Sequence, residues 1–268
     1  MEIAPGVHSM GQQKGGRVHA FLIDTGTELT LIDTLFDTDG HRVLEEIKRL
    51  GRSASDLKNI VLTHGHRSHL GGAAALKRQS GATVYSHEWE ADIIGGQRKA
   101  QAVSLKPANP LRVYHLQFGL AMGIGKHPPC PVDEVVGNGD HVGPLQVLHA
   151  PGHSPGHLAF HWPERRLLIA GDAIATWPDF SAGWKAFNLN RTQHADSLSL
   201  MAKLDPNVVG VGHGEPITDG GGDRIHELVE RGAQREGVQR WQVSLLGCGP
   251  SPPMRSTTGS IGIACGGR

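Results

Sequence analysis

Residues 59–72 of the chain read NIVLTHGHRSHLGG. The apolar run at 59–63 predicts a buried strand, and the stretch 73–78 predicts the helix that follows. Between them lie His64, His66 and His69. Two imidazoles at i and i+2 on a glycine-containing turn can point at one ion, and the third can approach from the start of the helix. Three histidines in six residues therefore predict a metal site that begins at this strand end.

Three more side chains that can bind metal follow predicted strands and lie next to glycine. They are His153 in APGHSPGH (150–157), Asp172 in AGDA (170–173) and His213 in GHGEP (212–216). An aspartate after a strand is usually a turn or capping residue, so each motif alone is weak evidence. Because strand ends in one sheet system share an edge, the three motifs together predict convergence on the first histidine cluster.

Predicted strands and helices come in two sets. The first set begins with a hairpin of two strands at 18–23 and 29–32. A helix follows, with Asp39 as its N-cap and Gly51 at its end. The set continues with the strand 59–63, the helix 73–78, a strand at 83–86 and a helix from His87 to Gly95. The second has strands at 145–149, 157–161, 166–170 and 207–211, and helices at 193–204 and 224–231. Residues 97–140 are rich in Gly and Pro, with a helix near 116–122, and together with the loop 176–184 they are expected to border the site. The repeat predicts two packed sheets flanked by helices.

Composition narrows the classes of function. Among 268 residues, 26 acidic side chains balance 26 basic ones, which gives no general reason to bind nucleic acid or a membrane surface. The three cysteines form no CxxC pair, and the first residues lack the pattern of a signal peptide, so we predict a cytoplasmic protein. We predict one hydrolase domain at 1–246 and a flexible Gly/Pro/Ser-rich tail at 247–268. The oligomeric state is not readable from the sequence.

The four motifs, in this order, resemble the metallo-β-lactamase superfamily, and the resemblance covers roughly residues 2–230. It implies an α+β fold, a four-layer αββα sandwich of two mixed β-sheets flanked by helices, with a dinuclear metal site. Asp33 in LIDT matches a structural aspartate of the family. The matching positions imply a first metal on His64, His66 and His153, a second on His69 and His213, and Asp172 as the bridge between them.

The chain departs from the family motif HxHxDH at one position, where Ser68 stands in place of the aspartate. A neutral hydroxyl is a weak ligand, so two outcomes are open: a weak second metal, or a mononuclear enzyme. Zinc is the metal we expect, as one or two ions, while iron and manganese also suit histidine and carboxylate ligands.

The resemblance implies a hydrolase that uses a metal-bound hydroxide, with Asp172 orienting the nucleophile. A small-molecule ester, lactone or thioester is the expected substrate, with a β-lactam also open. The nearest general type is lactonase or glyoxalase II, without the helical glutathione-binding domain, because residues 220–268 look too short and glycine-rich for it. Two alternatives stay open. One is a metal-binding scaffold or sensor whose turnover is weak because Ser68 replaces the usual aspartate. The other is a phosphodiesterase or nucleic-acid hydrolase.

Overall fold

The structure is a computed structural model that describes residues 1–100, 103, 105–122 and 126–246. Its contacts divide the chain into a unit of Met1–Arg231 and a second unit of Gly232–Arg268. All of the strands and all six predicted metal ligands belong to the first unit. The predicted tail at 247–268 lies outside the described residues, so the predicted domain boundary stays a prediction.

The described residues form twelve strands and eight α-helices with three short 3-10 turns. The strands are β1 (Glu2–Ala4), β2 (Val7–Gln12), β3 (Val18–Asp24), β4 (Leu29–Ile32), β5 (Leu57–Val61), β6 (Thr83–Ser86), β7 (Glu134–Val135), β8 (His141–Val142), β9 (Leu145–His149), β10 (Leu158–Trp162), β11 (Leu167–Ala175) and β12 (Val208–His213). The helices are α1 (Lys14–Arg17), α2 (His41–Arg49), α3 (Arg67–Leu70), α4 (Ala73–Ser80), α5 (Glu88–Ile94), α6 (Tyr114–Ala121), α7 (Arg191–Ala202) and α8 (Gly221–Leu246). The 3-10 turns are η1 (Ala54–Asp56), η2 (Leu111–Val113) and η3 (Pro163–Arg165).

The strands pair along one continuous path in the order β7-β6-β5-β4-β3-β12-β11-β10-β9-β8, and β2 and β1 extend from β3. Pairing is mixed: β4 to β7 run parallel to one another, as do β11 and β12, while the remaining pairs are antiparallel. The two halves of the sheet meet at one residue pair, Val18 of β3 and His213 of β12. The two predicted sheets are therefore the two halves of one curled sheet, joined at this junction, and they fit the predicted αββα sandwich.

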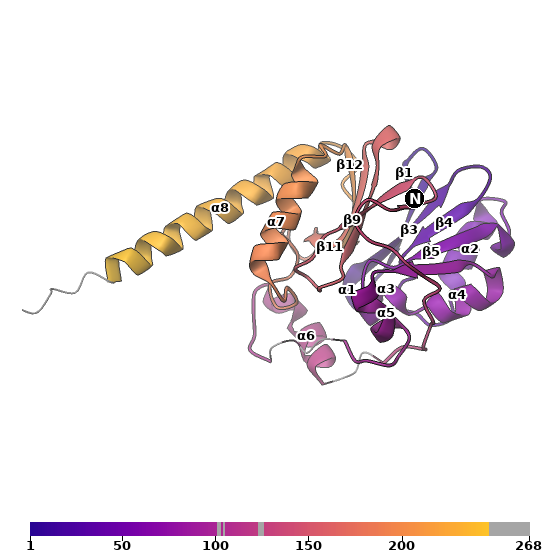
Figure 1. Cartoon of the computed structure of the whole chain (residues 1–268), viewed down its shortest axis with the longest axis horizontal. Helices are drawn as coiled ribbons and strands as arrows, with labels where there is room; N and C mark the ends of the chain where they lie inside the picture. The colour runs from indigo at the N-terminus through magenta and orange to yellow at the C-terminus, as the bar shows by residue number, and fades with distance from the viewer. Residues whose placement is uncertain (101–102, 104, 123–125, 247–268) are drawn as a thin grey trace, which may run out of the picture. The chain divides into compact units, whose positions relative to one another are not determined.

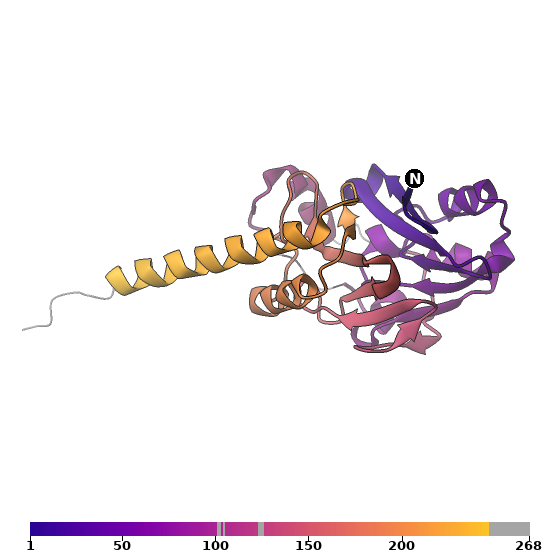
Figure 2. The same ribbon diagram turned by 90° about the horizontal axis from the view of Figure 1, so that it is seen from above.

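Successive side chains of each strand point to opposite faces of the sheet, so each strand contributes to two different layers of the core. Phe21 in β3 and Phe160 in β10 belong to a buried core between the two halves, whereas Leu22 belongs to a core shared with α2 and α4. On the other half, Leu168 faces α7 and α8. Figure 1 shows α2 and α4 beside β3–β5 and α7 beside β11 and β12, and Figure 2 shows the strands between these helices from above. The α+β fold with helices outside a curled mixed sheet is confirmed.

Most predicted elements are confirmed, including the hairpin of β3 and β4, and the strands β6 and β9 with the predicted bounds. The predicted N-cap at Asp39 is wrong. Gly40 takes that position with φ 68°, although the Asp39 carboxylate still accepts a hydrogen bond from the His41 N–H at 3.0 Å. Strands β1 and β2 were not predicted, because polar residues such as Ser9 interrupt the apolar pattern of β2.

Among the helices of the described residues, none carries an apolar stretch of the length that crossing a bilayer requires. The cytoplasmic location stays a prediction.

Replacing Phe160 by alanine tests the central core. Its side chain is fully buried between the two halves of the sheet, so Phe160→Ala should lower the free energy of unfolding by about 3–5 kcal/mol. Urea unfolding measures this change. Phe118→Ala is the matched control, because Phe118 is 45% exposed and its loss should cost about 0.5 kcal/mol or less. Equal costs for the two variants would contradict the assignment of Phe160 to the core.

Candidate metal centre

Three histidine nitrogens meet at the end of β5. The Nε2 atom of His64 lies 2.9 Å from Nδ1 of His66, which in turn lies 3.1 Å from Nε2 of His153. His64 and His153 are buried and His66 is half-buried. The carboxylate Oδ2 of Asp172 is 3.8 Å from His64 Nε2 and 3.4 Å from His153 Nε2. These four side chains form the first group of atoms that could hold an ion.

A second group shares the same carboxylate. Asp172 Oδ1 lies 3.2 Å from His69 Nε2, and Oδ2 lies 3.3 Å from His213 Nε2. The two Nε2 atoms are 3.4 Å apart. All six residues predicted as metal ligands are therefore brought together, in the two predicted groups, with Asp172 common to both.

Hydrogen bonds outside each group fix the tautomers. His69 donates from Nδ1 to the Asp33 carboxylate at 2.8 Å, and His213 donates from Nδ1 to the carbonyl of Gly16 at 2.9 Å. His64 Nδ1 is 3.0 Å from the Thr63 hydroxyl, which donates to the Asp33 carboxylate and is therefore free to accept. In its neutral form, each of these three rings would therefore present the Nε2 lone pair to the centre.

Asp33 follows β4 directly and is buried, with φ 58°, a conformation that is uncommon for a residue other than glycine. Its carboxylate also accepts a hydrogen bond from the Thr63 N–H at 2.8 Å. The strained backbone thus carries the acceptor that orients His69. The structural role implied for this aspartate agrees with these contacts.

The protonation states of the histidines differ between the two groups, and those of the first group suit metal binding. Burial lowers the pKa of His66 to about 4, and burial with neighbouring imidazoles holds the pKa of His64 and His153 well below the usual value. Burial also acts on His69, but the Asp172 and Asp33 carboxylates outweigh it and raise its pKa to about 10. Burial opposes ionisation of Asp172, yet His213, His69 and His153 hold its pKa well below the usual value. Metal binding at the second group would therefore displace a proton from His69.

The donor set fits a divalent metal. Ligands about 2.0–2.1 Å from a tetrahedral ion lie about 3.3–3.4 Å from one another. The separations within the two groups run from 2.9 to 3.8 Å and so lie around this value. Among the described residues, no hydrogen-bond donor of suitable geometry reaches the buried Oδ1 atom of Asp172, although His69 Nε2 is 3.2 Å away. A buried acceptor without a donor is costly unless a cation satisfies it.

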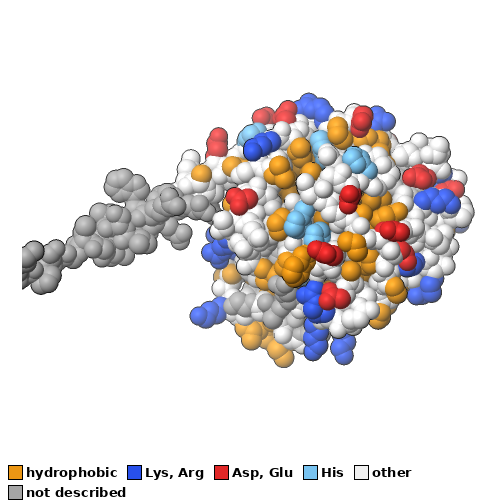
Figure 3. Space-filling view, in the orientation of Figure 1, with side chains coloured by type: hydrophobic (Ala, Val, Ile, Leu, Met, Phe, Trp, Pro, Cys, Tyr) orange, Lys and Arg blue, Asp and Glu red, His pale blue; other side chains and the backbone are white. Residues whose placement is uncertain are grey.

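Aromatic rings cover one side of the centre. Trp184 stacks on the His213 ring with a centroid distance of 4.1 Å, and Phe187 meets the His66 ring edge-on at 6.3 Å. Leu116 of α6 packs in the same apolar cluster, as the sequence predicted for residues 97–140. Phe180 does not join it and packs instead under Arg224. Figure 3 shows one face of the molecule, with histidine side chains in its middle next to hydrophobic and acidic ones.

Comparison with known proteins identifies the family. The model of the metallo-beta-lactamase superfamily matches residues 14–213, and the chain belongs to this superfamily of metal-dependent hydrolases. The probable metallo-hydrolase YybB of Bacillus subtilis (strain 168) is 25% identical over 201 residues, which are 75% of this chain and 82% of that protein. A hydroxyacylglutathione hydrolase of Rhodobacter capsulatus is 27% identical over 213 residues, 75% of this chain and 69% of that one. The structure of TTHA1623 in a di-iron-bound form superimposes with a TM-score of 0.56 at 26% identity and covers 78% of this chain and 93% of its own.

His157 and Asn188 are among the residues that support the centre and that were not predicted from the sequence. His157 is fully buried and accepts a hydrogen bond from the Asp172 N–H at 3.1 Å, while its Nδ1 donates to the Ala150 carbonyl at 3.2 Å. Asn188 lies 3.3 Å from His153 Nδ1. The spacing of His157 four residues after His153 was a signal for its proximity, whereas Asn188 has no local signal.

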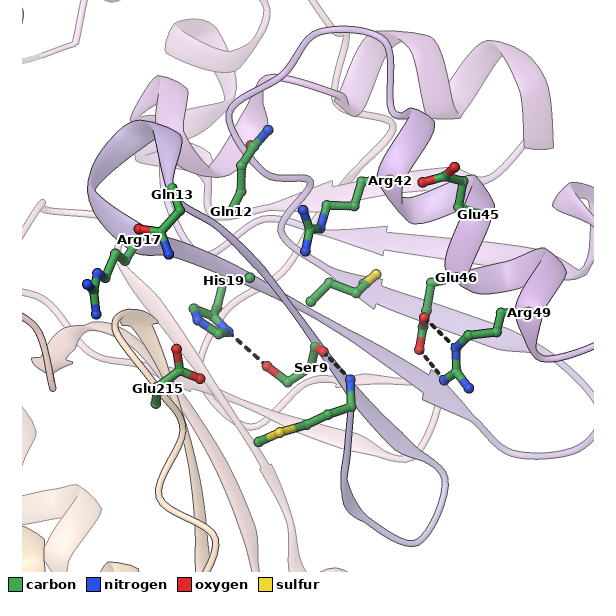
Figure 4. A pocket seen from close by; sticks show the side chains of 13 residues that line it. Ser9, Gln12, Gln13, Arg17, His19, Arg42, Glu45, Glu46, Arg49 and Glu215 are labelled. Carbon is green, nitrogen blue, oxygen red and sulfur yellow. Dashed lines mark hydrogen bonds and ion pairs between the residues drawn. The ribbon is translucent and has the colours of Figure 1, made fainter.

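A cavity of about 680 Å³ lies outside the metal centre, between β2, β3 and α2. Figure 4 shows its lining, with Arg42 and Glu46 from α2, Ser9 from β2, His19 from β3, and Glu215. His19 is buried and shares a hydrogen bond of 2.9 Å with the Ser9 hydroxyl. Burial lowers its pKa from 6.5 to about 4, although Glu215 acts in the opposite direction. The ring is consequently neutral at pH 7.

The burial of His19 predicts a contribution to acid lability. The unfolded chain binds a proton at His19 near pH 6.5 and the folded one only near pH 4, so this stability is complete above pH 6.5 and is lost as the pH falls toward 4. His19→Gln should flatten the decline of unfolding free energy between these pH values in urea titrations. Gln193→Ala is the control, because Gln193 is exposed and has no ionisable side chain, so its loss should keep the wild-type slope. A His19→Gln slope equal to that of the wild type would contradict the assigned effect of burial.

Proposed function

We propose that this protein hydrolyses an ester, lactone or thioester bond in a small molecule whose acyl part is apolar. The observation that carries the proposal is the place of Asp172 between two groups of histidines, with Trp184 stacked directly on His213. An apolar acyl group beside these rings would lose contact with water, which favours its binding. Similarity to a hydroxyacylglutathione hydrolase supports hydrolysis of an acyl compound.

The residues of the centre have distinct roles in this reaction. At neutral pH, His64, His66 and His153 would hold a divalent metal through unprotonated nitrogens. A divalent metal held there would supply Lewis acidity, which would polarise the acyl carbonyl and make the attacking water more acidic. Asp172 accepts a hydrogen bond from the attacking water and orients it toward the acyl carbon. The new C–O bond replaces the bond to the leaving oxygen or sulfur, and the leaving group takes up the proton that water loses.

The two groups are proposed to differ in affinity. The first offers three neutral imidazoles and Asp172, while the second has His69, His213 and the shared carboxylate. Ser68 adds no charge to the second group. The first site is therefore expected to hold its ion tightly and the second to exchange it readily, with zinc as the expected metal and iron or manganese as alternatives.

A substrate panel tests the reaction. Protein reconstituted with zinc, manganese or iron should hydrolyse one class among lactones, thioesters and aryl esters faster than phosphodiesters or a chromogenic cephalosporin. Asp172→Ala should reduce turnover by more than the roughly 100-fold typical of losing an outer partner of a metal site. Asp179→Ala is the control, because Asp179 is an exposed aspartate in the following loop.

The panel also separates the alternatives. Turnover of phosphodiesters alone would replace the proposal with a phosphodiesterase function. Intact metal with no turnover on any compound would favour a metal-binding scaffold weakened by Ser68. Unchanged activity in Asp172→Ala would refute the assigned mechanism.

The metal count tests the effect of Ser68. After gel filtration without added metal, elemental analysis should find about one ion per chain in the wild type, because the second group lacks the charge that strengthens a site. Ser68→Asp should retain about two ions, and Ser68→Asn, which adds similar bulk without charge, should stay near one. Two ions held by the wild-type protein would show that the second site is not weak.

A further inference from the structure

Glu90 in α5 is a buried glutamate that the proposed hydrolytic chemistry does not use. The residue is only 2% exposed, and α5 lies beside the loop that leads into α3 (Figure 1). Among the described residues, no lysine, arginine or histidine nitrogen comes within ion-pair distance of its carboxylate. A buried carboxylate must be satisfied by hydrogen-bond donors, so the identity of its donors indicates what it holds.

The donors come from the two loops that carry the first group of histidines. Oε2 of Glu90 accepts from the Gly65 N–H at 3.0 Å, and Gly65 separates His64 from His66. Oε1 accepts from the Ser154 hydroxyl at 2.6 Å and from the Gly156 N–H at 3.0 Å, and both donors closely follow His153 in the chain.

Close packing makes this arrangement specific. A Cβ atom at Gly65 would lie 3.0 Å from Oε2 of Glu90, and one at Gly156 would lie 2.8 Å from its Cγ. Both loops therefore approach the glutamate through glycine backbone. The two loops are 87 positions apart in the sequence, counted from His66 to His153, and one carboxylate spans them.

We propose that Glu90 is the positioning residue of the first metal site. It holds the 64–66 turn and the 153–156 turn at the separation at which their three nitrogens meet one ion. The second group depends on Asp33 and Gly16 instead, so Glu90 sets the affinity of the first site selectively. This inference rests on metal binding at the centre, which the proposed function also requires.

Glu90→Gln tests the role with little change of volume. An amide has one accepting oxygen, and its NH₂ group cannot accept from a peptide N–H. The Ser154 hydroxyl can reverse its hydrogen bond, but either the Gly65 or the Gly156 N–H must lose its acceptor. Glu88→Gln is the matched control, since Glu88 lies two positions away on the same helix and is exposed.

Each site is measured alone by zinc titration of metal-free protein against a chromophoric chelator. In a His213→Ala background, Glu90→Gln should raise the dissociation constant of the first site about 10- to 100-fold, the usual cost of losing an outer partner. In a His153→Ala background, it should leave the second site unchanged. Glu88→Gln should change neither constant.

The outcomes are distinguishable. An unchanged first site, or equal weakening of both sites, would overturn the role of Glu90, as would a lower unfolding temperature of the metal-free protein with an unchanged affinity. If the wild-type protein binds no zinc, the proposed function fails instead. If Glu90→Gln does not fold, Ser154→Ala removes only one donor and should weaken the first site roughly two- to tenfold. No change in that variant would equally overturn the inference.

Discussion

The negative charge of Asp172, buried among histidine nitrogens, is the constraint on which the rest of the centre depends. A carboxylate removed from water is unfavourable unless cations or donors surround it. Its Oδ1 atom faces His69, and its Oδ2 atom faces His64, His153 and His213. Residues from β11, β12 and the turns after β5 and β9 must consequently meet at one point.

The backbone around the carboxylate is built to allow this approach. A Cβ atom at Gly212 would overlap Asp172 Oδ1, so only glycine fits before His213. On the other side, Gly171 has φ 53° within β11, where the pairing with β12 shifts register. The strand therefore continues past the aspartate, and its irregularity turns the carboxylate toward the histidines.

Oriented hydrogen bonds convert a cluster of histidines into a set of ligands. Asp33, the Thr63 hydroxyl and the Gly16 carbonyl each accept a hydrogen bond from Nδ1 of a different ring, so that Nε2 of the neutral ring faces the centre. Glu90 instead accepts hydrogen bonds from the backbone of the two turns that carry the first group of histidines. Trp184 stacks on the His213 ring and so supplies an apolar surface beside the centre.

The local sequence determined most of the strands and the six candidate ligand positions in or after them, because apolar runs followed by glycine and histidine or aspartate are visible within a few residues. It also showed that Ser68 stands where the family motif HxHxDH has an aspartate. It did not show that β11 continues past Asp172. Only the tertiary structure decided that the two halves form one sheet joined at Val18 and His213, and that Glu90 joins two ligand turns. Contacts of this kind form between segments that are far apart in the chain. The residues around each segment carry no local pattern that would predict them.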